Sequence, residues 1–507
     1  MTSDRRGSAR EAIASLTDDF TELPTPPGEY APDGPLAWQG YDATRARAAE
    51  RTGEEESVVW GRATISPSPA VPGVSAVPGV SALPGVSAVL ISFEFGFLGG
   101  SLGERTGDRL EAAHTYARAH RLPVVSLVAT GGSRMQEGMR ALAQLQRVAR
   151  ESALTRAAGL PQIAVLRDPT TGGGWATLGA GADITLALPT AQIGFAGSRV
   201  RPPDADPTAY TAESQLAAGS IDAVIPPTAL HDTLTLYLTL LTTPSTAPAP
   251  PPHALAQPGR HGAQPLPSRG AGNCATSPHQ PAPATPQNHP PHEAPLPLTG
   301  WEAVQRARSP QRPHATAYLD TYFTRRAPLQ GDRAGGTDPG MLCGFGEHEG
   351  RAIAYAAQCG TPTRPAGYRT AARLIRLADR LGIPVLTLID TPGAANDAEA
   401  ERQGAGPAIA DLFTAVATAR TPLTTLLIGE GGSGGALALA APGNTWATPD
   451  SYFSVIAPEP AAAILKRPAH QAPATADELR VRPQDLVELG VVRGIAEPAP
   501  PLPDPSG

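Results

Sequence analysis

The sequence predicts an α/β fold built from two copies of one supersecondary unit. Apolar strand-like runs alternate with helix-like patterns in both halves of the 507-residue chain, which is typical of mainly parallel sheets with right-handed crossovers. The run at 123–128, PVVSLV, matches 384–389, PVLTLI. The next strand begins after Pro161 or Pro422, and 161 − 123 and 422 − 384 both equal 38. We therefore expect two domains related by pseudo-symmetry.

Each copy carries glycine-rich turns after two of its strands. The segments 130–133 (TGGS) and 390–394 (DTPGA) follow the first strand, and 171–174 (TGGG) and 429–435 (GEGGSGG) follow the second. Glycine lets the backbone approach a ligand closely, and the first turn of a helix offers unpaired N–H groups. A lone glycine cluster more often serves tight packing. Recurrence together with the preceding loop instead favours a site that binds an oxygen atom as it becomes negative.

Composition excludes several other classes of protein. A net charge of −7 and the lack of a dense Lys/Arg run argue against nucleic acid or an anionic membrane as the partner. Three cysteines without a C-x-x-C pair provide neither a disulfide framework nor a zinc ribbon, so we expect no metal. No apolar run of about 18 residues predicts a membrane span, and residues 1–20 lack the apolar core of a signal peptide. We expect a soluble cytoplasmic protein.

The first domain is expected to span 34–241. Residues 1–33 are polar and proline-containing, which predicts a disordered or loosely attached N-terminus. Strands are expected at 58–65 and 88–93, and the six-residue repeat between them, at 72–87, predicts an exposed expansion of a hairpin tip. Further on, helices are expected at 106–121 and 135–158, and the segment 212–226 is expected to contain a helix, a glycine cap and then a short strand.

A linker is expected at 242–299, because its Pro, Ala, His, Gln and Ser residues cannot form a core. Five of the eleven histidines lie in it. A histidine-rich metal tract is one interpretation, but irregular spacing favours a solvated, disordered linker. The second domain is expected at 300–498 and a tail at 499–507. Its helix at 315–326 precedes a hairpin at 341–355 that turns at 347–350.

The usual catalytic side chains are missing. No G-x-S-x-G or H-E-x-x-H pattern occurs. Asp168, Asp183 and Asp390 could act as acids or bases, but aspartates beside strand ends are mostly turn and cap residues. Chemistry is therefore expected to use backbone N–H groups and a proton acceptor brought by a substrate or cofactor. An enolate beside a thioester suits such a site, because each N–H donor stabilises its oxygen by ~2.7–4 kcal/mol.

The motifs of both halves together resemble a known family. The first half resembles the β subunit of bacterial acetyl-CoA carboxylase carboxyltransferase in four motifs: FEFGFLGGSLG (93–103), GGSRMQEGM (131–139), RDPTTGGGWA (167–176) and IGFAGSRV (193–200). The second half resembles the α subunit in four more: YLDTYFTRRAPLQGDRA (318–334), IDTPGA (389–394), IGEGGSGGALAL (428–439) and SVIAPEPAAAIL (454–465). The resemblance covers 34–498 apart from the linker, so the chain is similar to a β–α fusion.

The resemblance implies two domains of the ClpP/crotonase superfamily, that is, two crotonase-like domains. It implies a transferase that moves CO2 from carboxybiotin, held on a separate carrier protein, to an acyl-CoA, within an ATP-dependent complex for fatty acid biosynthesis. Biotin carboxyl carrier protein and biotin carboxylase are then the expected partners. The biotin nitrogen takes the α-proton, and the enolate attacks CO2. Acetyl-CoA, giving malonyl-CoA, is the expected substrate, and propionyl-CoA stays open.

The resemblance also implies the site residues. Two glycine pairs hold one oxyanion each, on the thioester and on the biotin urea: Gly172 with Gly173, and Gly434 with Gly435. Six neighbouring positions are expected to bind substrate: Gly131, Gly132, Arg134, Gly393, Ala394 and Ala436. Because each pair serves one substrate and both must converge, we expect a homodimer or a higher homo-oligomer in which the first domain of one chain faces the second domain of its partner.

Two other functions fit the sequence. One is a different enolate enzyme of the superfamily, such as an acyl-CoA decarboxylase subunit. The other is a catalytically silent scaffold subunit, which retention of both glycine pairs argues against.

Overall fold

The structure is a computed structural model that describes residues 7–25, 27–67, 85–256 and 295–499. The first sheet has eight strands: β1 (Asp19–Glu22), β2 (Val58–Ile65), β3 (Val86–Phe93), β4 (Val124–Thr130), β5 (Gln162–Thr171), β6 (Ile184–Ala187), β7 (Ile193–Gly194) and β8 (Ala223–Val224). The second also has eight: β9 (Arg325–Pro328), β10 (Met341–His348), β11 (Arg351–Gln358), β12 (Val385–Thr391), β13 (Leu423–Gly432), β14 (Thr445–Ala447), β15 (Tyr452–Ser454) and β16 (Gly494–Ile495).

The two sheets have the same topology. Their strand orders are β1-β2-β3-β4-β5-β6-β8, with β7 beside β5, and β9-β10-β11-β12-β13-β14-β16, with β15 beside β13. In each, one antiparallel hairpin leads into parallel strands. The central strands β4 and β12 are buried along their whole length, as expected for parallel strands covered on both faces. The predicted α/β fold with pseudo-symmetry is confirmed.

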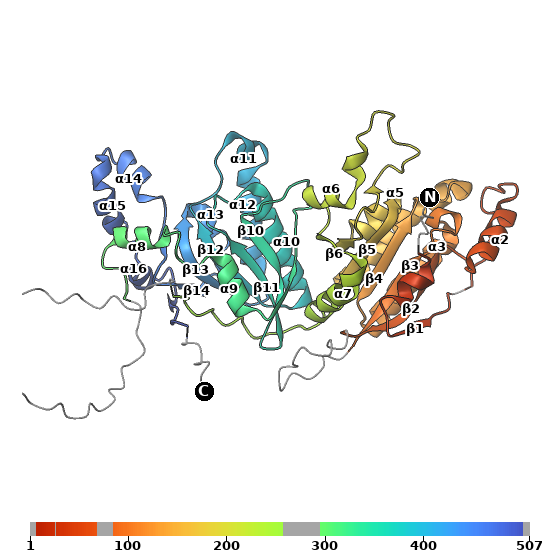
Figure 1. The fold of residues 1–507 in the computed structure, drawn as a ribbon, viewed down its shortest axis with the longest axis horizontal. Helices are drawn as coiled ribbons and strands as arrows, with labels where there is room; N and C mark the ends of the chain where they lie inside the picture. The colour runs from red at the N-terminus through yellow and green to blue at the C-terminus, as the bar shows by residue number, and fades with distance from the viewer. Residues whose placement is uncertain (1–6, 26, 68–84, 257–294, 500–507) are drawn as a thin grey trace, which may run out of the picture.

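Helices cover both sheets (Figure 1). Within the described residues, the α-helices of the first domain are α1 (Ala9–Ala14), α2 (Tyr41–Thr52), α3 (Glu104–His120), α4 (Gly138–Ala157), α5 (Gly172–Gly174), α6 (Ala212–Ala217) and α7 (Pro227–Leu241). Those of the second domain are α8 (Gly300–Ala307), α9 (Ala315–Tyr322), α10 (Pro365–Leu381), α11 (Ala398–Arg402), α12 (Ala405–Thr418), α13 (Ser433–Leu437), α14 (Pro458–Ile464), α15 (Ala472–Glu478) and α16 (Pro483–Glu488). None of these helices is long and apolar enough to cross a membrane, as far as the described residues go.

A constant residue offset relates the two site-bearing regions. In both sheets the register of the two central strands shifts by the same irregularity, after which Thr130 pairs with Thr170 and Thr391 with Gly431. The offset is therefore 391 − 130 = 261. The helices α3 and α10 keep it, since 365 − 104 and 381 − 120 are also 261. Adding 261 to a residue of β4, β5 or α3 thus gives its counterpart.

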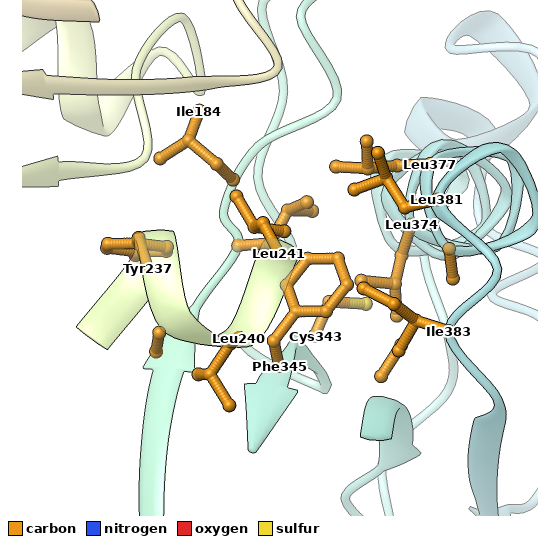
Figure 2. Packing of buried hydrophobic residues seen from close by; sticks show 14 of the residues in the cluster. Ile184, Tyr237, Leu240, Leu241, Cys343, Phe345, Leu374, Leu377, Leu381 and Ile383 are labelled. Atoms are coloured by element: carbon orange, nitrogen blue, oxygen red, sulfur yellow. The ribbon is translucent and has the colours of Figure 1, made fainter. Parts of the chain in front are cut away.

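The two domains share one apolar core across their contact. Helix α7 of the first domain packs on β10 and β11 of the second. Figure 2 shows Tyr237, Leu240 and Leu241 of this helix beside Phe345 and Cys343. The predicted domain boundary at 241 therefore lies at the end of a helix that is buried between both domains.

Ion pairs at the rim of this contact add to the apolar packing. The buried carboxylate of Asp222 contacts Arg333 at 2.5 Å and Arg373 at 3.2 Å, and Asp183 contacts Arg380 at 2.7 Å. These pairs join the first domain to the second, so the domains are held in a fixed arrangement.

The N-terminal segment is ordered where the structure describes it, so the prediction of disorder for 1–33 was wrong over 7–25 and 27–33. Ala9, Ile13 and Leu16 lie one helical turn apart and are almost fully buried in the core. Ser8 forms a capping box with Glu11 at the start of α1. Strand β1 then pairs antiparallel with β2. Three apolar residues and one cap were too weak a pattern to recognise.

The linker prediction was wrong at the two ends of 242–299. Ala249 and Ala254 are buried against the second domain. Thr424 donates a hydrogen bond to the carbonyl of Ala249 at 2.7 Å, and near 299 Gln484 donates to Pro297 at 2.7 Å. Small side chains and proline carbonyls suffice for docking along a surface even though they cannot build a core. The remainder of the predicted linker, 257–294, and most of the six-residue repeat, 68–84, lie outside the described residues.

Two further differences concern the start of the second domain. Helix α8 (Gly300–Ala307) was not foreseen, and the helix predicted at 315–326 ends at Tyr322. The chain then turns into β9, because Arg325–Pro328 pairs with β10. The predicted hairpin at 341–355 is confirmed, with His348 pairing with Arg351 around Glu349 and Gly350.

Candidate active site

In the first domain the chain turns sharply from β5 into α5. Gly172 adopts φ 64°, a left-handed conformation, and its N–H donates to the carbonyl of Phe195 at 3.1 Å. A Cβ atom at Gly172 would lie 3.0 Å from the Cα of Gly132. The absence of a side chain therefore lets the helix start touch the loop after β4.

The second domain repeats this turn with a different residue. Ser433, the counterpart of Gly172, adopts φ 58°. A Cβ at Gly435 would lie 2.4 Å from the backbone nitrogen of Ala394, so this helix start also touches the loop after its central strand. A Cβ at Gly434 would meet nothing within 4 Å. Gly434 therefore faces open space at the turn.

Each of the two loops has one N–H group for which the described residues provide no acceptor. Gly132 donates to Thr130 Oγ1 at 3.1 Å and Arg134 to the carbonyl of Leu102 at 2.8 Å. Between them, the N–H of Ser133 has no acceptor among the described residues. Ser133 is half-buried, so a ligand can approach it.

The loop of the second domain has the same arrangement. Gly393 donates to Thr391 Oγ1 at 3.1 Å and Ala395 to the carbonyl of Thr363 at 2.9 Å. Ala394, between them, is half-buried and its N–H has no acceptor in the described part of the chain. The adjoining helix start also offers N–H groups that lack intrahelical acceptors. Two such donors on neighbouring segments are the geometry of an oxyanion hole.

The first hole is defined by the N–H groups of Ser133 and Gly173, and the second hole by those of Ala394 and Gly434. The offset of 261 relates Ser133 to Ala394 and Gly173 to Gly434. The pairs expected from the sequence, Gly172 with Gly173 and Gly434 with Gly435, do not occupy equivalent positions. Matching glycine to glycine shifted the second pair by one residue, because a serine takes the left-handed position there. Ser133 was missed, although the offset between the strands would have identified it from Ala394.

The other residues expected to bind substrate lie at varied depths. Gly131 is exposed, Gly132 and Gly393 are buried within their loops, and Ala436 is fully buried in α13. Ala394 alone of the six combines access with an N–H that lacks an acceptor in the described residues.

Arg134 lies behind its loop and does not face a ligand. Its side chain is fully buried and its Nη1 contacts Glu56 Oε2 at 3.0 Å, while its Nη2 donates to the carbonyl of Ser101 at 2.8 Å. Burial alone would raise the pKa of Glu56, but the charge and hydrogen bonds of Arg134 outweigh burial and lower this pKa to about 2. The pair is therefore ionised at neutral pH and holds the loop in place.

The three aspartates beside strand ends have structural partners. Asp390 is buried and contacts Arg312 at 2.6 Å, Asp183 belongs to the ion pairs between the domains, and Asp168 accepts a hydrogen bond from the N–H of Gln192 at 3.0 Å. The described residues contain no group of three or more His, Cys, Asp or Glu side chains that could hold a metal ion.

Burial keeps the cysteines in this part of the chain as thiols. It raises the pKa of Cys359 to about 11, and it raises the pKa of Cys343 further. Neither side chain is a thiolate nucleophile at neutral pH.

Large apolar side chains are exposed around both holes. In the first domain Phe195 follows β7 and is 74% exposed; in the second Val455 follows β15 and is 71% exposed. Other exposed apolar residues on the adjoining helices are Met135, Met139, Leu437 and Ile464. Clusters of this kind mark protein contact surfaces.

Comparison with known proteins matches both halves of the chain. Residues 53–225 match the family described as carboxyl transferase domain, and residues 292–500 match the family described as acetyl co-enzyme A carboxylase carboxyltransferase-like. A Salinispora arenicola protein, acetyl-coenzyme A carboxylase carboxyl transferase subunits beta/alpha, is 36% identical over 98% of this chain and 83% of its own length. The alpha subunit from Methylobacterium sp. (strain 4-46) is 42% identical over 41% of this chain and 68% of its own.

Solved structures share the fold. Transcarboxylase 12S is described as a hexamer assembly with methylmalonyl-coenzyme A bound. Its structure matches this chain with a TM-score of 0.71 at 18% identity, and the match covers 97% of this chain and 87% of the transcarboxylase chain. A single-chain, multi-domain long-chain acyl-CoA carboxylase has a TM-score of 0.67 at 20% identity over 97% of this chain and 44% of its own.

Proposed function

The chain belongs to the acetyl-CoA carboxylase carboxyltransferase family in its fused beta/alpha form, and from this premise we propose that it transfers CO2 from carboxybiotin to acetyl-CoA. Carboxybiotin would arrive on a separate carrier protein, loaded by a biotin carboxylase. The product would be malonyl-CoA for fatty acid biosynthesis. The observation that carries this proposal is the pair of holes, one per domain, each with a loop N–H that lacks an acceptor among the described residues.

The first hole is proposed to bind the thioester of the acyl-CoA. Removal of the α-proton moves negative charge onto the thioester oxygen, and the N–H groups of Ser133 and Gly173 stabilise that charge. Each preorganised donor of this kind is worth ~2.7–4 kcal/mol. Arg134 and Glu56 keep the loop that carries Ser133 rigid, so its N–H does not have to reorganise during the reaction.

The second hole is proposed to bind the urea oxygen of biotin, the substrate that supplies CO2 and accepts the α-proton. The residues present fit such a group: the N–H of Ala394 has no acceptor in the described residues, and the space in front of Gly434 is open. A urea oxygen that gains negative charge as CO2 leaves is stabilised by these donors as the first hole stabilises the enolate. The aspartates and cysteines discussed above are not placed as bases, so a proton acceptor supplied by the substrate is consistent with the structure.

The two holes are proposed to meet between two copies of the chain. Within one chain they belong to separate sheets that lie side by side (Figure 1). A two-fold axis would bring the first domain of one copy against the second domain of its partner. The exposed Phe195 and Val455, each beside its own hole, would then be covered. Transcarboxylase 12S, which shares the fold, is described as a hexamer assembly, and an oligomer is therefore compatible with this fold.

The test uses the purified full-length chain with malonyl-CoA and free biotin. We expect biotin-dependent decarboxylation of malonyl-CoA to acetyl-CoA, which is the proposed reaction in reverse. In parallel, carboxylated carrier protein with acetyl-CoA should give malonyl-CoA. Decarboxylation at the same rate with and without biotin would indicate an acyl-CoA decarboxylase instead, and no turnover under either condition would contradict the proposal.

A further inference from the structure

A buried chain of polar side chains lies behind the second hole. The amide Nε2 of Gln358 donates to Thr363 Oγ1 at 3.1 Å and to the carbonyl of Gly435 at 3.3 Å. Thr363 Oγ1 lies 3.4 Å from Thr391 Oγ1, which donates to the carbonyl of Gly393 at 2.7 Å. The side chains of Gln358, Thr363 and Thr391 are completely buried. This chain therefore ties the helix start that carries Gly435 to the loop that carries Gly393.

Two polar atoms beside this chain have no hydrogen-bond partner in the described residues: Gln358 Oε1 and the hydroxyl of Tyr368. Tyr368 is fully buried, and its hydroxyl lies 2.6 Å from where a Cβ of Gly435 would sit. A buried polar atom without a partner costs about 1–3 kcal/mol. Such atoms concentrate at functional sites, where stability is not the only requirement.

The first hole has the same backbone frame but no such side chains. Leu102, the counterpart of Thr363, receives a hydrogen bond from Arg134 at 2.8 Å and donates to Gly132 at 2.9 Å, as Thr363 does to Gly393 at 3.0 Å. Its side chain is apolar and buried.

The other two positions are also apolar or empty in the first domain. By the register of β3 with β4, Phe93 stands where Gln358 stands in β11. Gly107 takes the place of Tyr368 in the corresponding helix, since 368 − 107 is again 261. The space that a side chain at Gly107 would need is occupied by Gln144. Thr130 keeps the hydroxyl of Thr391 in the first domain, since Gly132 donates to Thr130 Oγ1 as Gly393 donates to Thr391 Oγ1. The side chains of Gln358, Thr363 and Tyr368 are therefore what distinguishes the backing of the second hole.

We propose that Gln358 and Thr363 are positioning residues of the second hole. Their hydrogen bonds fix the distance between the loop 393–395 and the start of α13, and so align the N–H of Ala394 with that of Gly434. The first hole is supported differently, by the buried Arg134–Glu56 pair and by packing of Phe93 and Leu102. This inference rests on the proposed role of the second hole in binding the biotin urea.

The test compares Thr363→Val with Thr363→Ser in the full-length chain. Valine keeps the shape and removes the hydroxyl, whereas serine keeps the hydroxyl and removes a methyl group. We expect Thr363→Val to lower kcat for biotin-dependent malonyl-CoA decarboxylation at least tenfold, with KM for malonyl-CoA within about twofold and Tm within a few degrees. Thr363→Ser should stay within about threefold of the unsubstituted kcat.

Equal losses in the two variants, or a loss of malonyl-CoA affinity equal to the loss of kcat in Thr363→Val, would overturn the positioning role. A second readout does not depend on activity. Hydrogen exchange of a peptide covering 389–396 should be faster in Thr363→Val, and unchanged in Thr363→Ser, because only the first variant loses the side-chain hydrogen bonds of residue 363, while its backbone bonds to the loop remain in both. If the unsubstituted chain shows no turnover, the proposed function fails, and this exchange difference alone then decides whether the tether exists; equal exchange in both variants would overturn it.

Discussion

The glycine-rich turns of the two domains have the same backbone arrangement, but different side chains pack behind them. In both, a loop N–H and a helix start converge at the same point of the same sheet topology. The first is backed by apolar side chains and by the Arg134–Glu56 pair, whereas the second is backed by a polar chain with two unpartnered atoms among the described residues. The backbone of the hole is therefore the same in both domains while its support differs, which fits the proposal that each domain binds its own substrate.

The largest expected difference lies between neighbouring glycines of the second turn. Gly435→Ala places a Cβ 2.4 Å from the nitrogen of Ala394 and should push the loop away. We expect biotin-dependent turnover to fall by more than 100-fold, because both donors of the hole, worth ~2.7–4 kcal/mol each, are misaligned. Gly434→Ala places its Cβ in open space and should fold with an unchanged Tm. Equal Tm and turnover for the two variants would show that the close contact is not rigid.

Acid should affect the first domain more than the second. His114 is buried in α3, its Nδ1 lies 3.0 Å from Thr155 Oγ1, and its counterpart in α10 is Ile375. Burial, then the charges of Arg118 and Arg156, lower the pKa of His114 to about 4.

Because the pKa in the folded state lies below the unfolded value of about 6.5, the unfolded chain binds more protons between these values. The stability contributed by neutral His114 is thus complete above pH ~6.5 and is lost as the pH falls to about 4. We expect a loss of about 3 kcal/mol, measured by urea unfolding between pH 7 and pH 4. His114→Ile should flatten this dependence, and an equally steep profile in that variant would assign the acid sensitivity to other groups.

A smaller effect is expected from substituting the residue with positive φ in each turn, which is Gly172 in the first domain and Ser433 in the second. Gly172→Ala introduces a side chain at φ 64° and 3.0 Å from Gly132 Cα. We expect a loss of ~1–2 kcal/mol in the free energy of unfolding from the left-handed conformation. The KM for acyl-CoA should rise, because the first hole is the one proposed to bind the thioester. An unchanged denaturation midpoint would show that the turn relaxes.

The smallest effect is expected from the opposite change in the second turn. Ser433 already adopts φ 58°, so Ser433→Gly relieves strain but increases the entropy of the unfolded chain. We expect a net gain of up to ~1 kcal/mol, seen as a higher urea midpoint. A lower midpoint would mean that the serine side chain contributes contacts that outweigh the strain.

The sequence predicted that the two domains are related, but it did not predict which residues of the two turns are equivalent. The repeated apolar runs were enough to predict the strands of both sheets, and the glycine clusters were enough to predict both turns. The equivalence of Ser433 and Gly172 could not be recognised from the sequence, because a serine residue does not indicate a positive φ. Arg134 looked like a ligand contact because it follows the loop, whereas its partner Glu56 lies far away in the chain.

The polar backing of the second hole also could not be read from the sequence. Gln358, Thr363 and Thr391 come from three different segments, and only the pairing of β11, β12 and the loop after β11 brings them together. The docking of Ala249 and Ala254 is similar, since their burial depends on a surface formed by the second domain.

The central claim is that each hole serves one substrate. The most direct measurement compares Gly173→Val and Gly434→Val by calorimetric titration with malonyl-CoA and by biotin-dependent decarboxylation. At Gly173 the new Cβ meets only the flexible end of Leu145 among its nearest atoms, and at Gly434 it meets open space, so both variants should fold. We predict that Gly173→Val loses malonyl-CoA affinity, while Gly434→Val keeps that affinity and loses biotin-dependent turnover. The reverse pattern would exchange the two holes, and full turnover in both variants would contradict the account.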